Sequence, residues 1–333
     1  MEEEVPVSSR REFIAKTLLA TAGMAFPIIT TEAGKSTNII THRVSSGADE
    51  PMKVCIFSKQ MHWLGYEAMA QTAAQIGFDG IDLTVRPDGH VKPEHVETEL
   101  PKAIAAIHKA GLSVPMITTK ITDAKDPLTE PILKTASQLG VKYYRLGYLP
   151  YPDGVPMETT LQKYKQQLKA LADLNRKYNI QGAYQNHSGT DVGAPVWDLW
   201  YLIKEMDPRW MGSQYDIKHA TLEGGFSWPL GFKAIQSHIK TLDIKDFFWI
   251  KKNGKWDIQY TPLGEGMVDF KKFFALVKQY NISGPISLHL EYPLGGADTG
   301  ARKLTVPEST VIEAMRKDLT TLRGWLKEAQ LSG

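Results

Sequence analysis

The chain has 333 residues, of which 42% are hydrophobic and 23% are charged, and its formal net charge is +2. This composition excludes extended disorder, and the length allows one large core or two small ones. A charge so near zero, without a run of Lys and Arg after residue 50, excludes the basic surface that nucleic-acid binding needs. The only cysteine, Cys55, excludes an intrachain disulfide and thiolate zinc sites.

The N-terminal segment, residues 8–30, reads SSRREFIAKTLLATAGMAFPIIT and resembles a bacterial twin-arginine export signal. Its apolar stretch is short and is interrupted by Lys16 and Gly23, so we expect no stable membrane insertion after the signal is removed. The alternative is an amphipathic N-terminal helix. Residues 1–50 are therefore interpreted as a signal peptide and polar linker, the protein as exported to the periplasm, and residues 51–333 as the folded domain.

From Met52 onward, short apolar runs alternate with helical patterns. The predicted strands are 53–58, 79–85, 112–118, 141–146, 180–185, 211–216, 239–246 and 285–291. The predicted helices are 66–77, 95–110, 128–139, 157–179, 195–206, 229–237, 268–280 and 307–330. Such alternation predicts parallel pairing, and eight units predict a single-domain α/β fold, the (β/α)8 TIM barrel. A doubly wound open sheet is the alternative, but no glycine-rich phosphate turn follows the first strand.

In several predicted strands, polar residues occupy every second position. Thr241, Asp243 and Lys245 alternate with Leu242 and Ile244, and the same pattern recurs in residues 80–86 and 287–291. Because side chains alternate across a strand, the apolar set can face the helices while the polar set points into the barrel. Ligands bind at the C-terminal mouth of such barrels, which explains inward polar groups.

Ionisable or amide side chains end nearly every predicted strand. The candidate site residues are Asp82, Arg86, Lys120, Arg145, Gln185, His187, Asp216, His219, Asp243, Lys245, His289 and Glu291. Structural alternatives exist for some of them: Asp82, Arg86 and Arg145 could form ion pairs inside the barrel, and Asp216 could cap a helix. A lone His187 or His289 could be a hydrogen-bonded core histidine. Their joint position at strand ends favours one shared site.

Six segments in this order resemble the sugar phosphate isomerase/epimerases, the xylose-isomerase-like barrels. They are IGFDGIDLTVRPDGH (76–90), YQNHSG (184–189), YDIKHA (215–220), LDIKD (242–246), PLGEGMVDF (262–270) and SLHLEY (287–292). The resemblance runs from about residue 53 to residue 292. It implies a divalent metal at the barrel mouth, held by Glu, Asp, His and Glu from strands five to eight, with the two Glu moving the proton next to a carbonyl.

This chain departs from the family pattern at two of the four positions. Gln185 stands where the strand-five Glu is expected and Asp243 where the strand-seven His is expected, whereas Asp216 and Glu291 match. The resemblance then implies an oxygen-only set of Gln185, Asp216, Asp243 and Glu291, which favours Mg²⁺, Mn²⁺ or Ca²⁺ over Zn²⁺. Because an amide has no basicity, we expect Glu291 to transfer protons on one face and His187 on the other.

The substrate contacts are expected from the remaining strand-end groups. We assign this role to Asp82, Arg86, Lys120, Arg145, His219, Lys245 and His289. The predicted function is a metal-assisted isomerase or epimerase of a sugar or keto-sugar. A keto-sugar lyase or hydrolase on the same barrel, or a sugar-binding barrel without catalysis, remains open.

Other properties stay open at the level of sequence. The sugar and the oligomeric state are not specified by any pattern in the chain. The segment 249–266 contains Gly and Trp and could close over a substrate as a lid.

Overall fold

The barrel is described by a computed structural model that covers residues 52–331, so the predicted signal and linker, residues 1–50, lie outside the described residues. Its strands are β1 Val54–Phe57, β2 Gly80–Thr84, β3 Ser113–Thr118, β4 Tyr143–Arg145, β5 Gln181–Gln185, β6 Met211–Asp216, β7 Ile239–Ile244 and β10 Ile286–Leu288. They pair in parallel, and β1 joins both β2 and β10, which closes the barrel. The predicted fold is confirmed.

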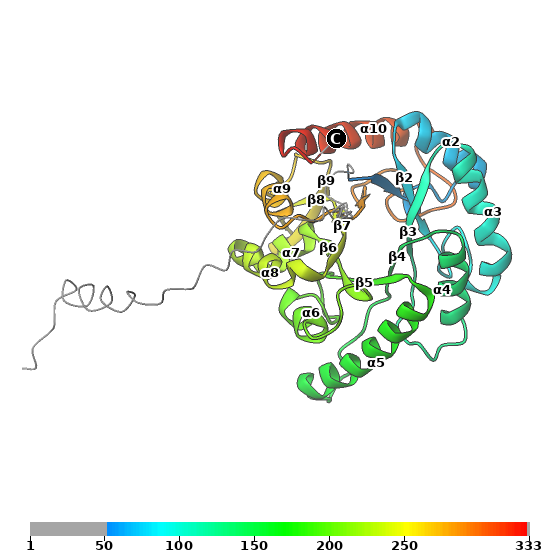
Figure 1. The fold of residues 1–333 in the computed structure, drawn as a ribbon. Helices are drawn as coiled ribbons and strands as arrows, with labels where there is room; N and C mark the ends of the chain where they lie inside the picture. The colour runs from blue at the N-terminus through cyan, green and yellow to red at the C-terminus, as the bar shows by residue number, and fades with distance from the viewer. Residues whose placement is uncertain (1–51, 332–333) are drawn as a thin grey trace, which may run out of the picture. The chain divides into compact units, whose positions relative to one another are not determined.

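Helices surround the barrel, as Figure 1 shows. They are α2 Tyr66–Ile76, α3 Val96–Lys109, α4 Thr129–Gln138, α5 Met157–Tyr178, α6 Val196–Ile203, α7 Ile217–Gly224, α8 Trp228–Ile235, α9 Phe270–Gln279 and α10 Glu308–Glu328. The last helix lies between α9 and α2 and completes the ring (Figure 1). Within residues 52–331, none of the helices combines the length and apolar character that crossing a bilayer requires.

Each helix packs against the barrel through one apolar face. In α10 the buried apolar residues recur every three or four positions, which is the period of a helix. They are Val311, Met315, Leu319, Leu322 and Leu326. The strands present their own apolar residues to this layer, for example Leu242 and Ile244 of β7, neither of which is exposed.

The polar residues of the strands face the barrel interior, as their parity predicts. Asp82 of β2 accepts a hydrogen bond from Ser287 of β10 at 2.7 Å, although β1 lies between these two strands. Thr118 of β3 donates to the same carboxylate at 2.9 Å. Such contacts can form only across the interior, so the strands deliver polar side chains to one central space.

The segment after β7 contains two strands that were not predicted. β8 Asp246–Lys252 and β9 Lys255–Thr261 form an antiparallel hairpin. A short helix, α7, was also not predicted. It begins directly at the end of β6, where the Asp216 side chain accepts the backbone N–H of His219 at 3.0 Å.

The base of the hairpin is fixed by one buried carboxylate. Both oxygens of Asp246 accept backbone N–H groups, those of Phe247 and Val268 on one oxygen and of Gly264 and Gly266 on the other. A Cβ on Gly266 would lie 2.1 Å from the Asp246 carboxylate, so only glycine fits there. The PLGEG segment therefore serves to anchor the hairpin at the barrel mouth.

Candidate active site

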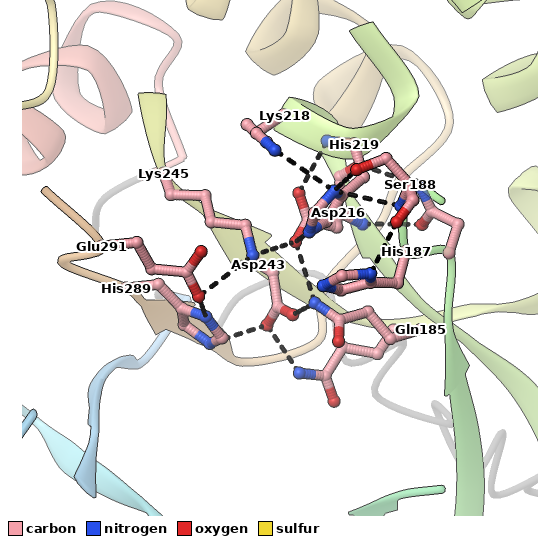
Figure 2. Close-up of polar contacts among 12 residues, drawn as sticks. Gln185, His187, Ser188, Asp216, Lys218, His219, Asp243, Lys245, His289 and Glu291 are labelled. Atoms are coloured by element: carbon pink, nitrogen blue, oxygen red, sulfur yellow. Dashed lines mark hydrogen bonds and ion pairs between the residues drawn. The ribbon is translucent and has the colours of Figure 1, made fainter. Parts of the chain in front are cut away.

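The centre of the site is the Gln185 amide at the end of β5 (Figure 2). Its nitrogen donates to Asp216 at 2.8 Å and to Asp243 at 2.5 Å. Its oxygen accepts from Arg145 at 2.9 Å and from Tyr148 at 2.6 Å. Every hydrogen-bonding position of this buried amide that faces the cluster is therefore occupied by protein atoms.

The second element of the site is the Lys245 ammonium, which lies between two carboxylates (Figure 2). Its Nζ is 3.0 Å from Asp216 Oδ2 and 3.4 Å from Glu291 Oε1. Burial alone would lower the pKa of Lys245, but Asp216, Glu291 and Asp243 raise it, so the amine stays charged. Burial would raise the pKa of Glu291, but Lys245, His289 and Lys59 hold it well below its usual range. We call Gln185, Asp216, Asp243, Lys245 and Glu291 the mouth cluster.

Asp243, like Asp216, is a fully buried carboxylate of the mouth cluster. Gln214 donates to its Oδ1 at 2.6 Å, on the side opposite Gln185, and His289 Nε2 lies 3.4 Å from the same oxygen. Burial and the nearby Asp216 raise the pKa of Asp243 well above its ordinary value. Burial lowers the pKa of His289 to about 3, so its ring, stacked on Phe57 at 4.3 Å, is neutral.

His187 and His219 lie side by side on the β5 side of the mouth, with ring centroids 4.0 Å apart. The Nδ1 of His187 lies 2.9 Å from the Ser188 carbonyl and donates to it, which leaves Nε2 as an acceptor. Burial and Lys245 lower the pKa of His187 to about 4. His219 Nδ1 accepts the backbone N–H of Ser188 at 3.1 Å, which turns its Nε2 toward Asp216 at 3.5 Å. His219 Nε2 thus faces Asp216 without forming a hydrogen bond, while Nε2 of His187 is available to accept a proton.

The other predicted contacts lie at different depths. Asp82 is fully buried, with both carboxylate oxygens bonded to Thr118 and Ser287, so it supports the layer beneath the mouth. Arg86 is half-buried and lies 5.5 Å from the centre of the Phe57 ring. Lys120 is exposed beyond the end of β3 and forms no ion pair within the part of the chain that the structure describes.

Several residues of the site were not singled out by sequence. Lys59, in the turn after β1, lies 3.7 Å from Glu291, and Tyr148 donates to Gln185 from the loop after β4. Lys218 lies 3.4 Å from the Tyr260 hydroxyl, and its pKa is lowered to about 8 by burial and by Lys245. Lys59 and Lys218 each lie two residues after the end of a strand, β1 and β6, and this position is the signal that could have identified them.

The predicted metal-binding set comes together, but its contacts do not fit a divalent ion. Gln185 N–H groups and the Lys245 ammonium contact one oxygen each of Asp216, Asp243 and Glu291, where a metal would otherwise bind. Lys59, Arg145 and Lys218 add further positive charge. Within residues 52–331, no group of three or more His, Cys, Asp or Glu side chains is arranged to hold a metal. In this structure, hydrogen bonds and ion pairs close the network at that place, and the Mg²⁺, Mn²⁺ or Ca²⁺ site stays a prediction.

Comparisons with known proteins agree with this architecture. The sequence profile of the xylose isomerase-like TIM barrel family matches residues 70–308. An inosose dehydratase of Lacticaseibacillus casei is 27% identical over 139 residues, which span 37% of this chain and 45% of that protein. The chain thus matches less than half the length of this curated relative.

Solved structures support the same fold at low sequence identity. The 3-keto-D-glucoside 4-epimerase of E. coli superposes with a TM-score of 0.61 at 15% identity, over 82% of this chain and 99% of that one. A xylose isomerase-like TIM barrel protein from Mycobacterium smegmatis, solved in complex with magnesium, gives 0.56 at 14% identity, over 80% and 98% of the two chains.

Proposed function

This chain belongs to the xylose isomerase-like TIM barrel family, and we propose that it is an enzyme that removes a proton from a carbon next to the carbonyl group of a keto-sugar. The observation that carries the proposal is the pair formed by Glu291 and Lys245 at the barrel mouth, 3.4 Å apart. Relatives on this barrel include a keto-glucoside epimerase and an inosose dehydratase, which supports a substrate of this class.

The two members of this pair have complementary roles in such a reaction. The Glu291 carboxylate takes the proton as the C–H bond breaks, and the electron pair moves onto the carbonyl oxygen to form an enolate. The Lys245 ammonium then stabilises the negative oxygen, which is the charge that develops in the transition state. As negative charge develops on the carbonyl oxygen and attracts Lys245, the ion pair between Lys245 and Glu291 weakens, which favours the transfer of the proton to Glu291.

Isomerisation or epimerisation needs a second proton-transfer group, and His187 is our candidate for it. Its Nε2 is unprotonated at neutral pH because the pKa of the ring is lowered to about 4 and Nδ1 donates to Ser188. Figure 2 shows the ring on the opposite side of the cluster from Glu291. The two groups can therefore address opposite faces of a substrate carbon bound between them.

Elimination is the second candidate reaction, and the protonation states favour it. An epimerase that inverts a carbon needs one of its two groups to carry a proton, whereas Glu291 and His187 both rest as acceptors at neutral pH. An elimination needs one base and one acid that protonates the departing hydroxyl or alkoxide. Lys218, whose pKa is lowered to about 8, can supply that proton.

Deuterium exchange tests the common step of both reactions. The protein is incubated in D2O with 3-keto-glucosides and with ketohexoses, and the signal of the proton next to the carbonyl is followed by NMR. We expect that signal to disappear with the wild type and Glu291→Gln to slow its loss by about 10²–10⁴-fold. Glu265→Gln, an exposed glutamate paired with Lys317, is the control and should exchange normally. Saturable binding without exchange would instead identify a sugar-binding barrel.

A further inference from the structure

The hairpin formed by β8 and β9 carries a row of large apolar side chains on one face. Across the hairpin, Phe247 pairs with Tyr260, Trp249 with Ile258, and Lys251 with Trp256. Directly paired residues lie on the same face, and residues two apart along a strand share it, so these pairs follow one another along one face. We call Phe247, Trp249, Trp256, Ile258 and Tyr260 the aromatic stripe.

The inner end of the aromatic stripe is continuous with the active site. Lys218 lies 5.3 Å from the centre of the Phe247 ring and 4.6 Å from that of Tyr260, and it approaches the Tyr260 hydroxyl at 3.4 Å. Phe247 is fully buried, and its ring meets that of Trp249 at 6.3 Å in an edge-to-face arrangement. The stripe therefore starts beside the mouth cluster and runs outward along the hairpin.

The outer end of the stripe is exposed. Trp249 is 43% exposed and Trp256 is 66% exposed, and the two rings line an open hollow of about 380 Å³. Large aromatic side chains left in solvent next to an active site indicate a surface that binds something. The step from Tyr260 to Trp256 along β9 spans about 13 Å, which is longer than a single substrate ring.

We propose that the aromatic stripe binds the second ring of a glycosidic substrate, so that the enzyme acts on keto-glycosides in preference to free keto-sugars. This inference rests on the proposed function, because it places the reacting ring at Glu291 and Lys245. The ring attached through the glycosidic bond then lies beyond Tyr260, in the hollow lined by Trp249 and Trp256. A second pyranose and an aryl group both present a ring with an apolar face, which stacks on aromatic side chains.

Calorimetric titration in a Glu291→Gln background tests the inference without turnover. The probes are phenyl 3-keto-glucoside, a 3-keto-disaccharide and free 3-keto-glucose. We expect Trp249→Ala and Trp256→Ala each to raise the Kd of a glycoside about tenfold and to change the Kd of the free sugar less than twofold. Trp197→Ala, which removes an exposed tryptophan of α6, should change neither.

The outcomes separate this inference from the proposed function. Equal changes for glycosides and free sugar, or no change at all, would overturn a binding role for the stripe. The glycoside with the greater dependence on the two tryptophans identifies the preferred second ring, aryl or pyranose. Absence of deuterium exchange with a retained tryptophan effect would reject the proton-transfer function and leave the stripe as a glycoside-binding surface.

Discussion

The amide at position 185 allows two carboxylates to lie next to each other inside the barrel. Asp216 and Asp243 both accept from its nitrogen, while its oxygen accepts from Arg145 and Tyr148. An ionised carboxylate has no donor, so a glutamate there would place a third carboxylate beside Asp216 and Asp243 with no hydrogen bond to offer. Gln185 and Lys245 together donate to these carboxylates, a role that a bound divalent ion would otherwise have.

Replacing Gln185 by glutamate adds the negative charge that the family pattern has at this position, and it tests whether a metal ion can bind there. Gln185→Glu is expected to lower the free energy of unfolding by roughly 3 kcal/mol in the presence of EDTA, because three carboxylates then meet in a buried space. Added Mn²⁺ should restore part of this loss, and the wild-type Tm should not respond to EDTA or Mn²⁺. Thermal unfolding followed by circular dichroism measures both effects.

The control variant introduces the glutamate at position 214, next to the other carboxylate oxygen of Asp243. Gln214→Glu removes a comparable donor from Asp243, but this position is not part of the expected metal-binding set. It should lose stability without recovery by Mn²⁺. A wild-type protein that binds one divalent ion per chain, or that loses activity in EDTA, would show that the mouth cluster rearranges around a metal.

Residue types at the mouth could be predicted from sequence, but their contacts could not. Asp243 belongs to the polar set that alternates with apolar residues in β7, and Gln185 and Asp216 end β5 and β6. These positions predicted that the three side chains lie close together. Which group donates to which depends on strand register and side-chain rotamers, and neither is encoded in the alternation of residue types. Lys120 illustrates the limit, because it follows a strand yet is exposed.

At the scale of elements, the β8–β9 hairpin is the main feature that sequence reasoning missed. Its turn is Asn253-Gly254, with φ of 52° and 77°, and Asn-Gly between two β-strands is the preferred sequence for such a two-residue turn. The signal was present, but the segment was interpreted from its Gly and Trp content as a loop that could close as a lid. The hairpin matters because it carries the aromatic stripe past the mouth cluster.

Asp246 should control whether the hairpin stays in place. Asp246→Asn replaces one acceptor oxygen by an NH2 group, so two of the four backbone N–H groups that it binds lose their partner. We expect a loss of about 2–4 kcal/mol in the free energy of unfolding, from two buried donors left unsatisfied. Trypsin should also cleave faster after Lys252 and Lys255 at the hairpin tip.

A second variant separates anchoring from a general effect of charge. Asp257→Asn removes an exposed carboxylate from β9 itself, and tryptic cleavage of the hairpin should remain at the wild-type rate. If both variants were cleaved equally fast, the four hydrogen bonds of Asp246 would not be what holds the hairpin.

At the scale of the whole molecule, the barrel was predictable because its units repeat. Each predicted strand overlaps a strand of the barrel, since buried parallel strands give short apolar runs between helical patterns. α7 was missed because Ile217–Gly224 immediately continues β6, without the polar break that separates other elements. The repeated units therefore determine the barrel, whereas α7 after β6 and the β8–β9 hairpin after β7 shape the site.

α10 completes the ring of helices and also contacts two segments at the barrel mouth. The buried carboxylate of Asp318 accepts the Leu263 backbone N–H at 3.2 Å and the Tyr292 hydroxyl at 3.1 Å. Leu263 follows the hairpin, and Tyr292 follows Glu291 in the chain. One side chain of the last helix therefore connects to the two segments that carry the aromatic stripe and the proposed base.

This connection should make stability depend on pH. Burial raises the pKa of Asp318 to about 6 from an ordinary value of 3.8, so between these values the folded protein binds more protons than the unfolded chain. Stability should therefore fall as pH rises from about 4 to about 6, by at most roughly 3 kcal/mol. Asp318→Asn keeps an acceptor for Leu263 and removes the charge, so it should stabilise the protein at pH 7 relative to the wild type but have little effect near pH 4. Urea unfolding at both pH values measures this, with Glu313→Gln on the exposed face of α10 as the control for loss of a charge. An Asp318→Asn effect of equal size at both pH values would contradict a raised pKa of Asp318 in the folded protein.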